Sequence, residues 1–333
     1  MTPFITIVMP VRNEARFIRE TLGQLLDQDY PADCFEIIVA DGMSDDGTPE
    51  IVTELGRRFP QLKLVPNPKR LSSAGRNLGF QHGRGDYFLV VDGHCFIPTS
   101  NLFKHLVDCF RDSGADCLGR PQPQDPPGLT PFQRAVALAR GSRLGHGGDS
   151  LIYGEFEGFA SPVSNGAAYT RRVFEVVGYL DEEFDAAEDV EFNYRVEQSG
   201  LLCYTSHRLT VRYYPRENLQ GLFCQMRRYG IGRWRFLCKH PKALTVNQLV
   251  PSLFTVGLAT FLAATAVALC TGHGWTAVAV MGVPFALYAA LVLAEAARIV
   301  RSDGGRIGVL VPSILLAVHL GLGIGFLKGA LGR

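Results

Sequence analysis

The sequence predicts an α/β fold with a doubly wound, mostly parallel sheet, followed by a C-terminal region of three membrane-spanning helices. Two observations predict the sheet. Short apolar runs alternate with segments of helical spacing from Phe4 to Val91, and the run Tyr87–Val91 is apolar throughout, as in a strand buried on both faces. The helices are predicted by three apolar runs of about twenty residues in the last third of the chain.

The N-terminal elements follow one another in a regular order. Strands are expected at residues 4–9, 35–40, 62–65 and 86–91, and helices at residues 15–28, 48–59 and 72–82. The second helix opens with Thr48-Pro49, and Pro is tolerated in a first helical turn. Strands that alternate with helices in this way form βαβ units, which build a parallel sheet.

The order is less regular after residue 95. Helices are expected at residues 102–111, 130–143, 171–177 and 188–199, and strands or turns at residues 115–118 and 163–169. Residues 141–158 are rich in Gly with scattered charge, which is typical of a mobile segment beside an active site.

The last third of the chain predicts membrane spans at about residues 249–270, 275–294 and 307–327. Buried helices of a soluble domain are the alternative, but three almost uncharged runs in succession disfavour it. Lys and Arg precede the first span and lie between the second and third, whereas the link between the first and second has neither. The positive-inside rule therefore places the α/β domain in the cytosol.

These features divide the chain into an α/β domain (residues 1–215), a basic amphipathic segment at the membrane surface (216–246) and a transmembrane region (247–333). Lys plus Arg is 33 against 32 for Asp plus Glu, so overall charge gives no case for nucleic acid binding. The eight Cys residues include no C-x-x-C pair, so the sequence indicates neither a zinc site nor a disulfide framework.

Asp92-Gly93-His94 follows the strand predicted at residues 86–91 and is the first candidate site. Open α/β sheets bind their ligands at the carboxyl ends of central strands. A carboxylate and an imidazole there are competent ligands for a divalent cation, and Gly93 allows a sharp turn between them. The alternative is that Asp92 only opens a turn and His94 is a partly buried loop residue.

Other polar residues are expected near Asp92. Asp41 ends the second strand and could accept hydrogen bonds from a ribose hydroxyl or a base N–H. There is neither a G-x-G-x-x-G nor a G-x-x-x-x-G-K-[ST] motif, so phosphate charge would be met by the cation and by basic groups such as Arg76. Arg76 as a surface residue of its helix is equally open.

Glu188-Asp189 lies at the start of a predicted helix, and either residue could act as a general base. Acidic residues are also common at helix starts because the helix dipole favours them.

Residues 225–234 combine an amide, several cations and aromatic rings just before the first span. An interfacial amphipathic helix explains this composition, with Arg at lipid headgroups and Trp234 at the membrane boundary. A cradle for pyrophosphate, in a nucleotide or in a lipid carrier, explains it as well, and both explanations can hold together.

Five of these stretches, in this order and spacing, resemble the family 2 inverting glycosyltransferases over about residues 4–240. They are Met9–Glu14, Val39–Thr48, Ala74–Gly79, Val91–His94 and Glu188-Asp189. Within the family, the sequence looks most like the succinoglycan-type membrane-associated glucosyltransferases of bacteria. That narrower likeness lies in Pro68–Asn77, Val91–Cys95, Tyr214–Arg216, Arg233–Phe236 and His240-Pro241.

The resemblance implies a GT-A fold, a nucleotide-sugar donor and a set of site residues. Asp189 would be the catalytic base, with Glu188 beside it, and Asp92 and His94 would hold Mn²⁺ or Mg²⁺. The family usually has D-x-D at the metal site, so Asp-Gly-His leaves the metal preference open. The donor would be bound by Pro10, Arg12, Glu14, Asp41, Arg76, Asp92 and Gly93. The acceptor would be bound by Asn165, Gly166, Gln225, Arg228 and Trp234.

The expected function is transfer of a sugar, glucose being favoured, from a UDP-sugar to a polyprenyl-diphosphate-linked oligosaccharide. The enzyme would work at the inner membrane of a bacterium in exopolysaccharide or surface-glycan synthesis. One alternative is transfer to polyprenyl phosphate, which makes a lipid-monophosphate sugar donor. Another is a non-catalytic nucleotide-sugar-binding subunit of a glycan-assembly complex. Membrane lipid is an expected partner, nucleic acid is not, and oligomerisation is left open.

Overall fold

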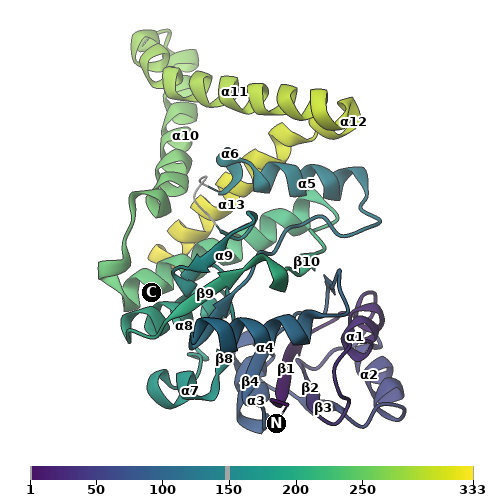
Figure 1. Ribbon diagram of the computed structural model, residues 1–333. Coiled ribbons are helices and arrows are strands. Elements are labelled where there is room, and N and C mark those ends of the chain that lie inside the picture. Colours follow the sequence, from purple (N-terminus) through teal and green to yellow (C-terminus); the bar gives the residue numbers. More distant parts are fainter. Residues whose placement is uncertain (1, 147–150, 333) are drawn as a thin grey trace. The chain divides into compact units, whose positions relative to one another are not determined.

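The computed structural model describes residues 2–146 and 151–332, which form two compact units (Figure 1). The first unit contains residues 1–127 and 150–214, and the second contains residues 128–149 and 215–333. Residues 128–149, which the sequence analysis assigned to the α/β domain, therefore group with the basic segment and the apolar C-terminal helices.

An eight-stranded sheet forms the centre of the first unit, with strand order β3-β2-β1-β4-β8-β6-β9-β7. The strands β1 to β4 are parallel, and β8 joins them antiparallel to both β4 and β6. Their bounds are β1 (Ile5–Val11), β2 (Phe35–Asp41), β3 (Leu62–Pro66), β4 (Tyr87–Val90), β6 (Cys117–Gly119), β7 (Glu157–Phe159), β8 (Gly166–Thr170) and β9 (Cys203–Ser206). The predicted α/β fold with a mostly parallel, doubly wound sheet is confirmed.

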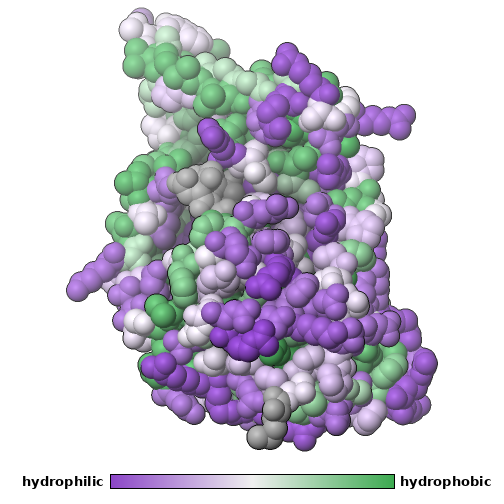
Figure 2. Space-filling model, viewed as in Figure 1, coloured by the Kyte–Doolittle hydropathy of each residue, from purple (hydrophilic) through white to green (hydrophobic). Residues whose placement is uncertain are grey.

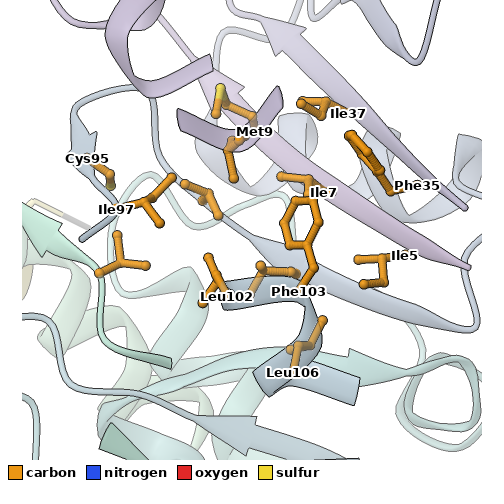
Figure 3. Close-up of a cluster of buried hydrophobic side chains, with 14 of the residues drawn as sticks. Ile5, Ile7, Met9, Phe35, Ile37, Cys95, Ile97, Leu102, Phe103 and Leu106 are labelled. Atoms are coloured by element: carbon orange, nitrogen blue, oxygen red, sulfur yellow. The ribbon is translucent and has the colours of Figure 1, made fainter. Parts of the chain in front are cut away.

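Helices cover both faces of this sheet. One face carries α1 (Ile18–Leu26), α2 (Thr48–Gly56) and α4 (Leu102–Ser113), and the other carries α3 (Ser72–His82), α7 (Arg171–Val177) and α8 (Glu188–Gln198). Because side chains alternate along a strand, β1 contributes to both cores. Its Ile5, Ile7 and Met9 pack with α4 (Figure 3), whereas Val8 packs in the opposite core.

Several boundaries differ from those expected. The first helix begins at Ile18 rather than Ala15, because residues 15–17 form a turn in which Glu14 O accepts from the backbone N of Phe17 and of Ile18. Of residues 141–158, residues 147–150 lie outside the described part. Short elements that were not predicted are β5 (Cys95–Phe96), β7, β9, β10 (Arg212–Tyr213), η1 (Pro162–Ser164) and η2 (His207–Leu209).

The second unit is helical throughout its described residues. Its elements are α5 (Pro131–Gly141), α6 (Arg143–His146), α9 (Leu219–Lys239), η3 (Pro241–Ala243), α10 (Val246–Thr271), α11 (Trp275–Asp303), α12 (Gly305–Gly308) and α13 (Val311–Leu331). Two contacts hold α5 and α6 to the C-terminal helices: Arg134 Nη2 donates to Asp303 Oδ1 at 2.9 Å, and His319 Nε2 lies 2.9 Å from Leu144 O.

Three segments of this unit are long and apolar enough to cross a membrane: Val246–Thr271, Trp275–Asp303 and Gly305–Leu331. Only 6% of the most apolar 18-residue stretch of each of the first two segments is buried inside the protein, against 50% of the corresponding stretch of the third. Hydrophobic residues accordingly gather on the surface over α10 and α11 (Figure 2). The predicted spans correspond to these segments.

The third segment is the more buried one because α13 packs closely on α9 and α10. Gly321 and Gly325 face α9, and Gly323 faces α10. A Cβ atom added to Gly325 would lie 2.1 Å from Arg227 O, and one added to Gly323 would lie 2.2 Å from Pro251 O. Glycines spaced by four residues let helix backbones approach in this way.

We therefore expect Gly325→Ala to lower the stability of the second unit. The added methyl group meets backbone rather than a side chain that could move, so the cost should be about 1–3 kcal/mol. Gly257→Ala in α10 is the matched control, because its Cβ would lie 3.5 Å from Phe285 Cζ, an ordinary contact. Thermal unfolding of the purified protein measures both, and equal midpoints would contradict the packing argument.

Candidate active site

The loops that follow β1 and β2 are tied together by hydrogen bonds around Asp41. This residue is 5% exposed, and its Oδ1 and Oδ2 atoms accept from Ser44 Oγ at 2.5 Å and Ser44 N at 3.0 Å. Ser44 Oγ in turn accepts from Asn13 N at 2.8 Å, and Asn13 Oδ1 accepts from Asp45 N at 3.1 Å. Asp41 is thus fixed at the carboxyl end of β2, as predicted.

The Asp92-Gly93-His94 turn follows β4 and packs against Glu14. A Cβ atom on Gly93 would lie 2.9 Å from Val11 Cγ1 and 3.0 Å from Glu14 Cγ, so only glycine fits there. His94 Nδ1 lies 2.9 Å from Glu14 Oε1. A carboxylate at Nδ1 favours the tautomer with its proton on that nitrogen, and the lone pair is then on Nε2. The strand β10 pairs with β5 directly after this turn.

The Arg76 guanidinium joins two of the predicted acidic residues. Its Nη2 atom lies 3.7 Å from Glu188 Oε1 and 4.0 Å from Asp92 Oδ1. Burial disfavours the charged guanidinium, but the negative charges of Glu188, Asp189 and Asp92 outweigh burial and raise the pKa of Arg76. Since only 13% of its side chain is exposed, Arg76 is not a surface residue of α3.

The close packing of α3 on β1 positions Arg76. Gly75 and Gly79 face the strand: a Cβ atom on Gly79 would lie 2.3 Å from Val8 Cγ1, and one on Gly75 would lie 3.0 Å from Pro10 Cβ. The helix can therefore lie close to the strand, and it carries Arg76 to the carboxyl end of the sheet.

Two neighbouring carboxylates lie at the N-terminal end of α8. Glu188 is 7% exposed, and burial raises the pKa of its carboxyl while the charge of Arg76 opposes that shift. Asp189 is partly exposed, and its Oδ1 accepts from Val190 N at 2.9 Å. Glu188 is thus held by Arg76, and Asp189 is the carboxylate that a molecule from solvent can reach.

The sequence analysis missed a second buried cation, Arg120, which directly follows β6. It is 2% exposed, and its Nη2 donates to Val90 O at 2.9 Å and to Tyr213 Oη at 3.1 Å, whereas its Nε and Nη1 have no hydrogen-bond partner among the described residues. The burial of Tyr213 and the charge of Asp92 raise the pKa of this phenol. The sequence pattern that could have identified Arg120 is the position of a charged residue directly after an apolar strand.

The two predicted metal ligands, Asp92 and His94, lie in one turn, but two side chains alone do not complete the coordination of a metal ion. Asp92 and His94 offer an oxygen and a nitrogen donor, each about a quarter exposed. Within residues 2–146 and 151–332, no group of three or more His, Cys, Asp or Glu side chains is arranged to hold a metal. A cation at this pair would take its other ligands from water and phosphate oxygens, as Mg²⁺ usually does.

Among the described residues, no hydrogen bond or ion pair joins the remaining predicted residues to the side chains of Asp92, Arg76, Glu188 or Asp189. Pro10 faces Gly75 in the first unit, and Arg12 is exposed beside Gly42. Asn165 is buried and donates to Thr205 Oγ1 at 3.2 Å, and Gly166 starts β8. Gln225, Arg228 and Trp234 belong to α9 in the second unit. Their roles in binding stay predictions.

Comparison with known proteins identifies this α/β architecture. A mannosyltransferase, PcManGT from Pyrobaculum calidifontis in complex with GDP-Man and Mn2+, has the same fold with a TM-score of 0.62 and 19% identity, covering 100% of this chain and 88% of that one. The chain therefore has the GT-A fold that the sequence resemblance implied.

Residues 6–177 match the family described as Glycosyl transferase family 2. The succinoglycan biosynthesis protein ExoA of Rhizobium meliloti (strain 1021) is 31% identical over 322 residues, 96% of this chain and 93% of that protein. The dolichyl N-acetyl-alpha-D-glucosaminyl phosphate 3-beta-D-2,3-diacetamido-2,3-dideoxy-beta-D-glucuronosyltransferase of Methanococcus voltae is 23% identical over 98% of this chain and 97% of that protein. The chain belongs to glycosyl transferase family 2, and its predicted likeness to succinoglycan-type enzymes is confirmed.

Replacing Arg76 by Gln should destabilise the first unit by about 3 kcal/mol at neutral pH, because buried carboxylates lose their counter-charge. Without Arg76, the folded-state pKa of Glu188 rises further above its unfolded value of 4.5. The loss should therefore shrink as pH falls through that raised pKa toward 4.5. Chemical unfolding at several pH values measures this.

Arg19→Gln is the control, because Arg19 also pairs with a Glu but on the surface, where an ion pair contributes little. A loss of stability for Arg76→Gln that does not change with pH would contradict the electrostatic explanation.

Proposed function

We propose that this family 2 glycosyltransferase transfers a sugar, glucose being favoured, from a UDP-sugar to a lipid-linked oligosaccharide with inversion of the anomeric carbon. The acceptor is a polyprenyl-diphosphate-linked glycan in exopolysaccharide or surface-glycan synthesis. The observation that carries the proposal is the different environment of the two adjacent carboxylates, Glu188 and Asp189.

This difference supports Asp189 as the base. Glu188 is buried and lies 3.7 Å from the Arg76 guanidinium, so its carboxylate is occupied in holding that cation. Asp189 is partly exposed, and its Oδ1 accepts a hydrogen bond from the next backbone N–H, that of Val190. A general base has to reach the proton that it removes. Asp189 meets that requirement, and Glu188 acts by positioning Arg76.

The reaction needs one proton transfer and one displacement. Asp189 accepts the proton of the acceptor hydroxyl, the hydroxyl oxygen forms a bond to the anomeric carbon, and the bond from that carbon to the nucleotide diphosphate breaks. Attack from the face opposite the leaving group inverts the configuration. Asp41, fixed by Ser44 at the end of β2, supports recognition of the uracil or ribose of the donor.

Asp92 and His94 would hold a divalent cation, Mn²⁺ or Mg²⁺, which when bound offsets the charge of the departing diphosphate. The residues fit such an ion for two reasons. Their donors are an oxygen and a nitrogen that borderline and hard cations accept. The contact of Glu14 with His94 Nδ1 also matches the way a carboxylate orients a metal-ligating imidazole.

The lipid-linked acceptor is supported by the relatives and by the second unit. ExoA is named for succinoglycan biosynthesis, and the name of the Methanococcus voltae relative contains a dolichyl-linked sugar phosphate. The three segments that could cross a membrane would keep the enzyme beside such a lipid. Asn165, Gly166, Gln225, Arg228 and Trp234 remain the proposed acceptor residues.

We also propose that the protein lies in the bacterial inner membrane with its catalytic domain in the cytosol. The basic residues before the first span and between the second and third support this orientation. The ion pair between Arg134 of α5 and Asp303 at the end of α11 supports it independently, because it ties the link between the second and third spans to a helix that lies, in the sequence, between the two segments of the first unit.

Asp189→Asn should lower sugar transfer by about 10²–10⁴-fold, because the amide cannot accept the proton. Binding of UDP should stay close to that of the wild type, since the change keeps the shape of the side chain. Transfer is measured as labelled lipid product, and UDP binding by calorimetry. Glu197→Gln is the control, because Glu197 is exposed on the same helix and its loss changes the charge equally. Retained turnover in Asp189→Asn would remove it as the base.

Nucleotide release from a panel of UDP-, GDP- and dTDP-sugars, with manganese or magnesium in a bacterial lipid extract, tests the donor and the metal together. We expect release from a UDP-sugar only, its loss on adding a chelator, and its loss in Asp92→Ala but not in Asp33→Ala, an exposed carboxylate elsewhere in the first unit. No release with any donor, despite UDP binding, would contradict the proposed transfer.

A further inference from the structure

Two arginines of the second unit, Arg140 and Arg233, are close enough for the charge of one to act on the other, and no acidic residue of the described part pairs with either. Arg140 lies at the end of α5 and is 8% exposed, and Arg233 lies in α9 and is partly buried. The two helices belong to one apolar core, to which α5 contributes Ala139, α9 contributes Met226 and α13 contributes Leu315. Both arginines therefore extend from helices that pack in the same core.

No acidic residue in the described part of the chain neutralises this pair. The second unit has fourteen Lys and Arg residues among its described positions but only three Asp and Glu residues: Glu217, Glu295 and Asp303. Glu295 pairs with Arg298, and Asp303 pairs with Arg134. Within residues 2–146 and 151–332, the side chains of Arg140 and Arg233 make no ion pair and no hydrogen bond.

This arrangement costs free energy in the absence of a ligand. Burial and the positive charge of Arg140 both lower the pKa of Arg233. Like charges in a partly buried environment repel more strongly than in water, and no carboxylate of the described residues pairs with either arginine to offset that repulsion. A bound anion would remove the cost, and two guanidinium groups match the oxygen atoms of a phosphate.

The neighbouring side chains on α9 fit the same ligand. Gln225, Tyr229 and Arg233 follow one another at intervals of four residues and so lie along one face of the helix. Gln225 Nε2 donates to Tyr229 Oη at 3.3 Å, which holds an amide and a phenol in line with Arg233. The amide, the phenol and the guanidinium can each donate a hydrogen bond to the oxygen atoms of a phosphate.

We propose that Arg140 and Arg233 bind the phosphate of the lipid-linked acceptor. A lipid phosphate is favoured over a soluble one because Arg233 precedes the first residue of α10, Val246, by little more than three helical turns of chain. The strong excess of positive charge in this unit also favours an anion at a membrane surface. This inference rests on the proposed lipid-linked acceptor, and it gives that acceptor a binding site made by Arg233 together with Arg140, which lies in none of the motifs named above.

The test measures binding without any sugar donor. Full-length protein in neutral phosphatidylcholine nanodiscs is titrated with polyprenyl diphosphate, and binding is followed by the fluorescence of the two Trp residues, one of which is Trp234. We expect Arg140→Gln and Arg233→Gln each to weaken binding at least tenfold, whereas the Lys variants keep most of it. Arg301→Gln is the control, because Arg301 is exposed in the last turn of α11 and its loss changes the charge equally.

Thermal unfolding separates binding from folding. Without lipid, the two Gln variants should unfold at a temperature no lower than the wild type, because each removes a repelling charge. A lower unfolding midpoint would show that Arg140 and Arg233 stabilise the folded protein, and it would overturn the proposal. Unchanged polyprenyl diphosphate binding in both Gln variants would also overturn it. So would equal binding of phosphatidylglycerol or of inorganic pyrophosphate, which would identify a general headgroup site or a soluble anion site.

The same titration keeps this inference apart from the proposed function. If no donor supports transfer but polyprenyl diphosphate binding depends on Arg140 and Arg233, the proposed transfer fails and the phosphate site stands. If transfer to a lipid-linked acceptor occurs and neither Gln variant changes the acceptor KM, the function stands and the site fails.

Discussion

One buried guanidinium holds the acidic residues of the candidate active site together. Asp92 follows β4 and Glu188 starts α8, far apart in the sequence, and the Arg76 guanidinium that pairs with both offsets their repulsion. Arg76 can reach this position because Gly79 lets α3 lie against Val8 of β1. The charge balance of the site therefore depends on the packing of one helix on one strand. The position of Arg76 also explains why Glu188 and Asp189, though adjacent, have different environments: Glu188 pairs with Arg76, whereas Asp189 is partly exposed.

The loops around the site are held in conformations that most residues avoid. Among the described residues, non-glycine residues with positive φ occur just after β1, just after β2, just before α3 and just before α8: Asn13, Met43, Arg70 and Ala187. Each costs on the order of 1 kcal/mol and persists only where surrounding contacts require it. Such contacts are present, since Ser44 and Asp45 bond Asn13. The strain is thus located where the site needs fixed geometry.

Alternating apolar runs were enough to predict the sheet, and apolar length was enough to predict the three spans, because both signals are local in sequence. Asp41, Asp92 and Glu188-Asp189 were predicted because each directly follows or begins an element. Arg120 was missed because its importance depends on burial beside Tyr213, which β10 brings from a distant part of the chain. Residues 128–149 group with the second unit through contacts such as Arg134 with Asp303, which no local pattern reveals.

The net charge of the chain is near zero because the two units carry net charges of opposite sign. Lys and Arg number 33 against 32 for Asp and Glu, yet the described part of the second unit has fourteen of the former and three of the latter. The first unit must then carry the excess of negative charge. A nucleotide diphosphate that binds near Asp92, Glu188 and Asp189 would be repelled by these carboxylates and favoured by an accompanying cation, whereas the proposed lipid phosphate would meet arginines that no acidic residue of the described part neutralises. Charge alone thus gives a physical reason for two phosphate-bearing substrates to bind by different means, one through a cation and one directly.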